Sequence, residues 1–475
     1  MESTGSASIR APRTVVANAV DKGISLWYPG VHGTIDTFRT ATYTSEHFLD
    51  GTVFPAVQAV VGLQEQLAKG FVGTLRGDST WKQYGKDTWD RFRAGARFRR
   101  LVNTMGKELF GSARFAGETV LAENDYFTLT YIPAKEGTAA HIPLFHVGGT
   151  IPYGDRLFRL LPEANFYGRF IERGMPVYTM ELRGDRYQNN YSSLTLAGLV
   201  DSIERMSAVA YRHAGRKMVL EGYCGHGLQA LAYLAAKPED AEEKLCAVAF
   251  FVSPIHGPDC ATIADFPQRV PASWAKMQTA WLQRTSGYVP GDSMRISLDL
   301  ALKKNFVKTP MGQFFDGWNQ AELAHVRRME DLSAGQRKML AGAYWISADN
   351  GNRFPIPVDL SRYATAMFVE GISKQGDIPF RYQDKPLSLS GFLSRTSMPV
   401  IGFYGGTDPM IPDRTAFILM DLLKERYQHV VHPNAGHISY VFSASQWEKG
   451  HKRAFRPNPI DVLLTATGSS EAENR

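Results

Sequence analysis

One short stretch, residues 218–227, constrains the fold of this chain more than any other. An apolar, β-prone run ends at Gly222, a polarisable side chain follows at Cys224, and an Ala- and Leu-rich helical pattern comes next. Such a tight strand-to-helix turn forces its central residue into a strained backbone and holds that side chain above the end of a sheet. Because strand and helix nearly touch there, small residues are needed, and Gly225 and Gly227 flank the turn.

The central residue of this turn, Cys224, carries a thiol that can act as a nucleophile. The positive end of the helix behind it favours a thiolate, and free backbone N–H groups there can stabilise a developing oxyanion. Free cysteine is also among the most buried residue types, so a structural cysteine in an ordinary turn is the alternative. The rest of the chain decides between these two interpretations.

Alternating apolar strands and amphipathic helices on both sides of the turn predict an α/β fold. We expect a mainly parallel sheet with helices on both faces. After a hairpin at 118–131, the predicted strands are 142–147, 177–182, 217–221, 247–252, 399–404 and 428–432. Residues 254–397 interrupt the alternation, and an insertion of that length is expected to cap an active site. Its many aromatic residues suit an apolar acyl ligand.

At 475 residues the chain is long enough for two or three structural units. We predict a helical N-terminal region at 1–117, a first part of the sheet core at 118–253 and a cap at 254–397. The second part of the core is predicted at 398–465, and a polar tail at 466–475. The site is therefore expected to be assembled from two separate segments of the chain.

The composition, 44% hydrophobic with 12% aromatic residues, is typical of a folded enzyme. The three cysteines have no paired spacing, which argues against disulfides and favours a reducing compartment. No metal-ligand spacing is evident, so we expect neither a bound metal nor a cofactor. The chain begins without the apolar core of a secretory signal and has no apolar run long enough to cross a membrane, so we expect a cytoplasmic protein.

The net charge of +6 is concentrated in residues 81–114, which contain nine Lys or Arg and three Asp or Glu. Interleaved aromatic and aliphatic residues predict that this segment forms a basic amphipathic helix. One interpretation is a helix packed on its own domain with solvated cations. The other is a surface for an anionic body, a lipid-coated body or a partner protein. We expect no nucleic-acid partner, because no recognition motif accompanies the charge.

Two further residues fall where a nucleophilic enzyme built on such a sheet needs them. Asp408 follows the strand predicted at 399–404, and His437 follows the next strand, so both are expected at the edge where the turn places Cys224. The chain order of nucleophile, acid and histidine is that of the α/β-hydrolase fold. In this catalytic triad His437 would take the proton of Cys224, and Asp408 would orient the imidazole.

The oxyanion hole is predicted from two loops. Gly225 begins the helix and offers a free N–H, and the loop at 148–150 is expected to bring the N–H of Thr150 near the reacting carbonyl. We interpret His226 as structural, although it stands only two residues after Cys224. The sequence offers no acidic partner at a useful spacing for three other histidines, which we interpret as core or rim residues: His146, His256 and His432.

Together these residues resemble the polyhydroxyalkanoate synthase family, a branch of the α/β-hydrolase fold with a cysteine nucleophile. The resemblance covers residues 116–442 and is carried by Gly222-Tyr223-Cys224, by Asp408 with Ile411-Pro412, and by Gly436-His437-Ile438. It implies a divergent acyltransferase that moves 3-hydroxyacyl groups from coenzyme A thioesters onto Cys224. Coenzyme A thioester would then be a substrate, with no separate cofactor.

The same resemblance implies a homodimer that associates with polyester granules, which would give the basic helix of 81–114 a surface to bind. Two alternatives remain open. One is a cysteine hydrolase, either a thioesterase or an intracellular polyhydroxyalkanoate depolymerase. The other is a non-catalytic, granule-associated relative. Transfer and hydrolysis differ in whether a hydroxyacyl group or water reaches the acyl-enzyme, and a cap that excludes water favours transfer.

Overall fold

The computed structural model describes residues 45–46, 48–139, 141–149, 154–183, 191–269, 272–290, 306–347 and 355–468. Within these ranges it contains an eight-stranded sheet in the order β1-β2-β4-β3-β5-β6-β11-β12. The strands are β1 (Thr119–Glu123), β2 (Phe127–Ile132), β3 (Leu144–Val147), β4 (Val177–Leu182), β5 (Met218–Tyr223), β6 (Leu245–Phe251), β11 (Val400–Gly405) and β12 (Tyr427–His432). Strands β1, β2 and β4 pair antiparallel, and every pairing from β4 to β12 is parallel. The predicted α/β fold with a mainly parallel sheet is therefore confirmed.

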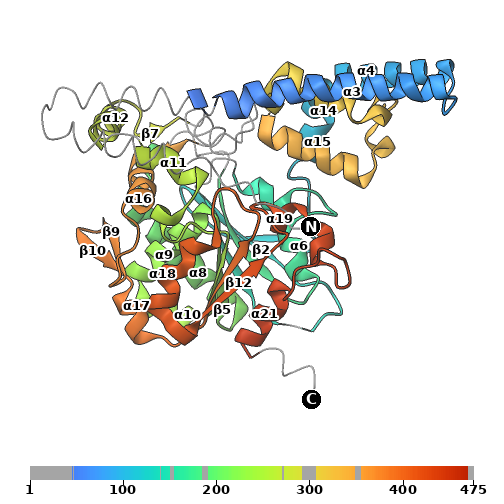
Figure 1. Ribbon diagram of the computed structural model, residues 1–475. Helices are drawn as coiled ribbons and strands as arrows, with labels where there is room; N and C mark the ends of the chain where they lie inside the picture. Colours follow the sequence, from blue (N-terminus) through green and yellow to red (C-terminus); the bar gives the residue numbers. More distant parts are fainter. Residues whose placement is uncertain are drawn as a thin grey trace, which may run out of the picture.

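Helices cover both faces of this sheet, as predicted (Figure 1). Successive side chains of a strand point to opposite faces, and on β5 Leu220 belongs to one hydrophobic core whereas Val219 belongs to the other. The first core is closed by α8 (Leu196–Ala214) and α9 (Gly225–Ala236), and the second by α6 (Phe166–Ile171) and α21 (Pro459–Ala466). Shorter helices complete the layers: α10 (Pro238–Lys244), α18 (Phe417–Leu423), α19 (Ser439–Phe442) and α20 (Ala444–Trp447).

Local sequence signals explain where the longest of these helices begins and ends. At the start of α8 the Thr195 side chain accepts a hydrogen bond from the Gly198 N–H, and at its end Gly215 has a φ of 65°. The first is a standard N-cap, and the second is a left-handed C-cap conformation that glycine adopts without strain. Between them an apolar stripe faces the sheet, including Leu199, Ile203 and Met206, all buried. These signals fix both ends of α8.

The segment between β6 and β11 contains the elements of the predicted insertion. They are α11 (Thr262–Arg269), α12 (Ala272–Thr285), β7 (Tyr288–Val289), α14 (Pro310–Trp318), α15 (Ala334–Ser347), β8 (Ile356–Pro357), α16 (Val358–Val369), β9 (Asp377–Tyr382), β10 (Lys385–Ser388) and α17 (Ser390–Arg395). The insertion divides in two, because α14 and α15 lie beside the N-terminal helices while α16 and the β9–β10 hairpin lie beside the core (Figure 1). Tyr363 of α16 donates a 2.7 Å hydrogen bond to the Leu228 carbonyl of α9. That the insertion caps a substrate remains a prediction.

The predicted helical N-terminal region is present in the described residues as a hairpin of α3 (Phe54–Arg76) and α4 (Trp81–Leu101) (Figure 1). The π-helical turn η2 (Val102–Gly106) and the short α5 (Lys107–Leu109) continue it toward the sheet. The basic helix α4 packs on its own chain, since Arg97 donates to the Val326 carbonyl at 2.6 Å and Arg91 to that of Trp318 at 3.3 Å. Helix α3 exposes a row of large apolar side chains: Phe54, Val57, Val60, Val61, Phe71, Val72 and Leu75.

Within the described ranges, none of the helices combines the length and the apolar character that crossing a bilayer requires. The expectation that no segment spans the membrane agrees with this finding for those ranges. Helix α3, which exposes these apolar residues, also carries exposed charged residues such as Glu65 and Lys69.

The contact between α4 and α14 predicts how two glycines of the same helix respond to alanine. A Cβ at Gly95 would lie 2.7 Å from the Phe314 ring and 2.8 Å from its carbonyl oxygen, whereas a Cβ at Gly85 would meet nothing within 4 Å. Gly95→Ala should therefore lower the free energy of unfolding by about 1–3 kcal/mol through overpacking. Gly85→Ala should raise it by about 0.5–1 kcal/mol, because alanine loses less backbone entropy in a helix. Urea unfolding of both variants measures this, and equal effects would show that α4 does not pack on α14.

Candidate active site

Cys224 occupies the strained turn that the sequence predicts. Strand β5 ends at Tyr223, helix α9 begins at Gly225, and Cys224 between them has φ 51° and ψ −125°. For a residue other than glycine, such a conformation costs about 1–3 kcal/mol and persists only where surrounding contacts enforce it. One such contact is the hydrogen bond of 2.8 Å from the Cys224 N–H to the Phe251 carbonyl at the end of β6. The side chain remains partly exposed, as a nucleophile requires.

Two glycines let β5 and α9 approach each other closely enough to form this turn. A Cβ added at Gly222 would lie 2.8 Å from the Cα of Gly227, and one added at Gly227 would lie 2.3 Å from the hydroxyl of Ser253. Ser253 in turn donates a 2.9 Å hydrogen bond to the Gly222 carbonyl. The glycines at 222 and 227 are therefore required by steric contact, as the sequence analysis expects.

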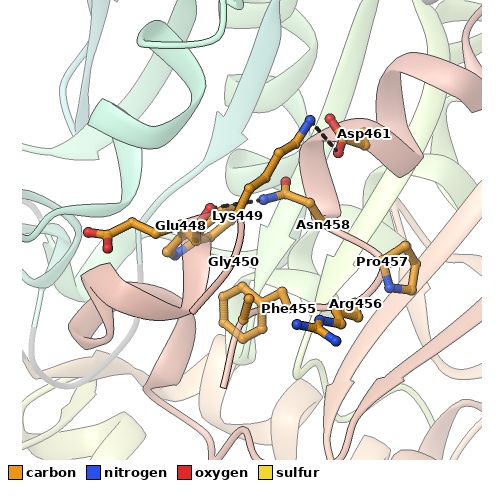
Figure 2. A pocket seen from close by; sticks show the side chains of 10 residues that line it. Glu448, Lys449, Gly450, Phe455, Arg456, Pro457, Asn458 and Asp461 are labelled. Atoms are coloured by element: carbon orange, nitrogen blue, oxygen red, sulfur yellow. Dashed lines mark hydrogen bonds and ion pairs between the residues drawn. The ribbon is translucent and has the colours of Figure 1, made fainter. Parts of the chain in front are cut away.

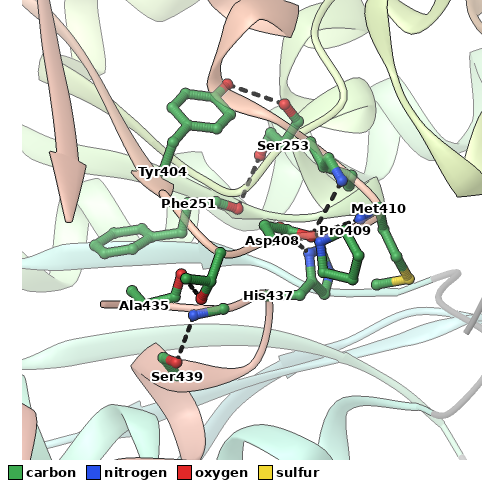
Figure 3. Close-up of polar contacts among 12 residues, drawn as sticks. Phe251, Ser253, Tyr404, Asp408, Pro409, Met410, Ala435, His437 and Ser439 are labelled. Carbon is green, nitrogen blue, oxygen red and sulfur yellow. Dashed lines mark hydrogen bonds and ion pairs between the residues drawn. The ribbon is translucent and has the colours of Figure 1, made fainter. Parts of the chain in front are cut away.

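The acid and the histidine meet at the carboxyl ends of β11 and β12 (Figure 3). Asp408 is fully buried in its side chain, and its Oδ2 accepts a 2.7 Å hydrogen bond from His437 Nδ1. Its Oδ1 accepts backbone N–H bonds from Met410 at 2.9 Å and Ile411 at 3.1 Å. Backbone N–H groups therefore fix one oxygen of the carboxylate, and the other oxygen accepts the hydrogen bond from the imidazole.

The imidazole of His437 joins this carboxylate to the thiol. Burial disfavours its protonated form, but the negative charge of Asp408 and then that of Cys224, with hydrogen bonds to both side chains, raise the pKa of His437 to about 10. Since Nδ1 is bonded to Asp408, Nε2 is the nitrogen available to Cys224. The hydroxyl of Tyr223 holds the loop by donating a 2.5 Å hydrogen bond to the His437 carbonyl. The three predicted triad residues are therefore brought together.

The predicted oxyanion donors can be placed only in part. Gly225 is the first residue of α9, so its N–H has no partner within the helix and lies directly after the nucleophile. Thr150 lies outside the described residues. In the neighbouring position, the N–H of Gly149 donates to Asp155 Oδ1 at 3.2 Å and is thus already engaged. The N–H of Gly225 is the one predicted donor whose position supports the role.

His226 is buried below the turn rather than lining a cleft. Its side chain is 0% exposed, and burial, together with the nearby His146, holds the pKa of His226 well below its usual range. Its Nε2 lies 3.6 Å from Asp155 Oδ1. The interpretation of His226 as a residue of the interior agrees with this position.

The other histidines have partners that the sequence analysis did not find. His146 is a core residue, as interpreted, and it also has an acidic partner that its sequence spacing did not reveal, because its Nδ1 hydrogen-bonds to Glu221 in the neighbouring strand. His256 is partly buried, in keeping with a rim residue, and its Nε2 lies 3.9 Å from Asp259. His432 is a core residue as expected, with Nδ1 bonded to Tyr440 and Nε2 to the Pro457 carbonyl.

Two acidic residues of this buried region were missed from the sequence. Glu221 lies in the apolar strand β5 with 0% exposure, and a lone charge inside such a run was the available signal. Asp155 lies in the single turn η3 (Asp155–Arg159) and accepts N–H bonds from Gly149 and Leu182. Burial, and then the charge of Glu181, raise the pKa of Asp155 to about 7. No local pattern pointed to Asp155, because its partners come from other strands.

A surface pocket of about 200 Å³ lies elsewhere, between α20 and the start of α21 (Figure 2). Its lining includes Trp447, Lys449, Asn458 and Asp461, and none of the triad residues. Ligand pockets for small molecules are usually about 300–1,000 Å³. This pocket is smaller and contributes nothing to the triad chemistry.

Comparison with known proteins finds only distant structural likenesses. No protein-family model matches the chain, and no curated protein matches it. Three solved structures show what the chain resembles. A soluble variant of the monoglyceride lipase of Saccharomyces cerevisiae is 10% identical with a TM-score of 0.43, covering 75% of this chain and 99% of its own. An esterase from Exiguobacterium antarcticum is 12% identical with a TM-score of 0.39, covering 74% and 98%, and a carboxylesterase from Bacillus subtilis is 13% identical with a TM-score of 0.38, covering 79% and 99%.

The chain has an α/β-hydrolase fold. This assignment rests on its own strand order, on the turn at Cys224 and on the acid and histidine that follow β11 and β12. Because the TM-scores lie below 0.5, no activity is carried over from the solved structures. Likewise, membership of the polyhydroxyalkanoate synthase family is not shown.

The three cysteines should react very differently with iodoacetamide. Burial raises the pKa of Cys246 to about 11 and that of Cys260 further still, so both stay protonated near neutral pH. We expect alkylation at Cys224 alone in the folded protein, lost in Cys224→Ala and slowed about tenfold or more in His437→Gln, which has no proton acceptor. Peptide mass spectrometry after short labelling measures this. Labelling of Cys246 at the same rate as Cys224 would contradict the expected order.

The pKa of His437 also predicts how stability depends on pH. Its folded value of about 10 lies above the ordinary 6.5, so the protonated imidazole stabilises the fold fully below pH 6.5. That contribution is lost as the pH rises toward 10. Denaturant unfolding of wild type and His437→Gln should therefore differ most near the low end of this window and converge toward the high end. A difference in the free energy of unfolding that does not change with pH would rule out the raised pKa.

Proposed function

We propose that this chain is a cysteine-dependent hydrolase of acyl thioesters, with Cys224, His437 and Asp408 as its catalytic triad. The observation that carries the proposal is the position of His437, which bonds Asp408 at 2.7 Å through Nδ1 and interacts with Cys224 at the same time. A thiol on a strained strand-to-helix turn, paired with an oriented imidazole, is suited to nucleophilic attack on an acyl carbonyl.

In the first step the Cys224 sulfur attacks the carbonyl carbon of the thioester while His437 holds the thiol proton. The oxygen becomes negative in the tetrahedral intermediate, and the N–H of Gly225 is placed to donate to it. The bond to the coenzyme A sulfur then breaks, and His437 returns the proton to that leaving thiolate. The product is an acyl group in thioester linkage to Cys224, with free coenzyme A.

In the second step water replaces coenzyme A as the partner of the acyl group. His437 accepts a proton from water as its oxygen attacks the acyl carbonyl, and the Cys224 thiolate leaves and recovers that proton. The acid is released and the thiol is restored. Asp408 stays ionised throughout and stabilises the imidazolium that forms in each step.

Hydrolysis is favoured over polymer synthesis by two departures from the synthase pattern. That pattern has a histidine directly after the acid and a tryptophan a few residues on, where this chain has Pro409, Met410 and Ile411. It also has a second glycine where this chain has His226. The chain therefore keeps the residues that form and break an acyl-enzyme but lacks these two features of the synthase pattern.

The second candidate is the 3-hydroxyacyl transferase that the resemblance implies, with a hydroxyacyl group in place of water. The exposed apolar row on α3, including Val57, Val61 and Leu75, would let the protein bind a lipid or polyester surface in the cytoplasm. Exposed cations of α4, such as Lys82 and Lys86, would add attraction to an anionic coat. The same surface of α3 and α4 would also suit a homodimer interface or the granule contact of a non-catalytic protein.

Incubation with 3-hydroxybutyryl-coenzyme A separates these activities. We expect release of free thiol with one equivalent of 3-hydroxybutyrate, and about 10³-fold or greater loss of rate in Cys224→Ala, because the covalent route is removed. Thiol release is followed by a colorimetric reagent and the acid by chromatography. Cys246→Ala is the matched control, because it removes a buried thiol that lies outside the triad.

Other products of this assay would decide against the hydrolase. Polymer in place of free acid would identify the transferase. Absence of thiol release from 3-hydroxybutyryl-coenzyme A and from acetyl- and longer acyl-coenzyme A donors would leave the non-catalytic relative. Unchanged turnover in Cys224→Ala would refute the triad itself.

A further inference from the structure

A second polar cluster lies in the interior, directly beneath the turn that carries Cys224. It consists of His146 on β3, Asp155 at the start of η3 and His226 on α9, and all three side chains are buried. One nitrogen or oxygen from each lies within 4.8 Å of those from the other two. None of the three contributes to the triad. Three residues from three different elements thus converge on one enclosed point.

His146 is held in an orientation that frees one nitrogen for this point. It stands directly opposite Glu221 in the β3–β5 pairing, and its Nδ1 hydrogen-bonds to the Glu221 carboxylate. The remaining nitrogen, Nε2, is buried without a hydrogen-bond partner among the described residues. A histidine that binds a metal commonly donates its other ring N–H to a carboxylate in this way, which fixes both its tautomer and its orientation.

The imidazole of His226 makes even fewer hydrogen bonds than that of His146. Both of its ring nitrogens are buried without a hydrogen-bond partner in the described part of the chain. Its ring meets that of His146 edge to face, with centroids 5.5 Å apart, and its Nε2 lies 3.6 Å from Asp155 Oδ1. Leaving a buried polar atom without a partner costs about 1–3 kcal/mol, so three such nitrogens call for a ligand.

Asp155 supplies the negative charge. Its two oxygens accept N–H bonds from Gly149 at 3.2 Å and Leu182 at 3.1 Å, which leaves lone pairs on both. Within the described residues its ion pairing is to His226 alone, whereas the nearby Arg159 is shared between Glu118 and Glu181. A buried carboxylate without a cationic partner is costly, and a bound cation would offset that cost.

We propose that His146, Asp155 and His226 bind one divalent transition metal ion of the zinc class, beneath the nucleophile turn. Two imidazole nitrogens and one carboxylate oxygen form a donor set suited to zinc, and magnesium and calcium prefer oxygen alone. Tetrahedral zinc holds its ligand atoms about 3.3 Å apart, given bonds near 2.0–2.1 Å. The 3.6 Å between His226 and Asp155 is close to this spacing.

The ion has a structural role, because its three ligands are buried in the interior and none of them belongs to the triad. It joins three elements of the core: β3, η3 and the start of the nucleophile helix α9. A metal was not expected from the sequence, because the ligands stand at 146, 155 and 226 and have no short spacing between them. Only the fold places them together.

The test measures zinc bound to the full-length chain, purified without a metal-affinity tag or chelator. It is carried out in the Cys224→Ala background, so that the triad thiol cannot bind zinc itself. Inductively coupled plasma mass spectrometry should find about one zinc per chain, or one after dialysis against zinc. Asp155→Asn keeps the size and the acceptor oxygen of the side chain but loses its charge, and it should weaken zinc binding roughly tenfold or more.

Two further measurements make the result specific to this cluster. Asp413→Asn is the matched control, because Asp413 pairs with His429 at 3.3 Å elsewhere and should leave zinc binding unchanged. Cobalt should replace zinc and give the visible absorption of a tetrahedral site, which His226→Gln should abolish even if the variant is only moderately stable.

Two outcomes would overturn the proposal. One is a chain that holds less than about a tenth of an equivalent of zinc both as purified and after exposure to zinc, with no rise in its thermal midpoint. The other is zinc bound equally well by wild type, Asp155→Asn and His226→Gln, which would place the ion at some other site.

Discussion

The close approach of β5 and α9 is the constraint on which the rest of the site depends. Gly222 and Gly227 lie so close together that no side chain fits between the strand and the helix. Cys224 connects the two elements with a positive φ. This geometry lifts the sulfur clear of the sheet and leaves the first N–H of α9 beside it. This strain is offset by the hydrogen bond from the Cys224 N–H to the Phe251 carbonyl and by the packing of Ser253 against Gly227.

Both polar systems of the core are arranged around this turn. Asp408 and His437 follow the ends of β11 and β12. Asp408 bonds the imidazole of His437, and His437 interacts with the thiol of Cys224. Below the turn, His146, Asp155 and His226 gather on the side of β3 and η3. A hydrogen bond from Gly149 to Asp155 joins the lower cluster to the loop that leads away from β3.

Patterns that depend on neighbouring residues were readable from the sequence, and contacts between distant segments were not. Strand β4 lies at the predicted 177–182, and β12 begins one residue before the predicted 428–432, because β-branched and apolar runs end at clear turn residues. Asp408 and His437 were found because strand ends of a parallel sheet share one edge. The Glu221–His146 pair was missed, since it depends on strand register, and so was Asp155 beneath His226.

The proposed chemistry depends on covalent acylation of the Cys224 sulfur with the help of His437. The most direct measurement is intact-protein and peptide mass spectrometry after rapid acid quenching of the chain mixed with 3-hydroxybutyryl-coenzyme A. We expect an added hydroxybutyryl group on the peptide that contains Cys224, and none in a chain with His437→Gln over the same interval. An acyl group on any other residue, or steady release of coenzyme A with no adduct at any time, would contradict it.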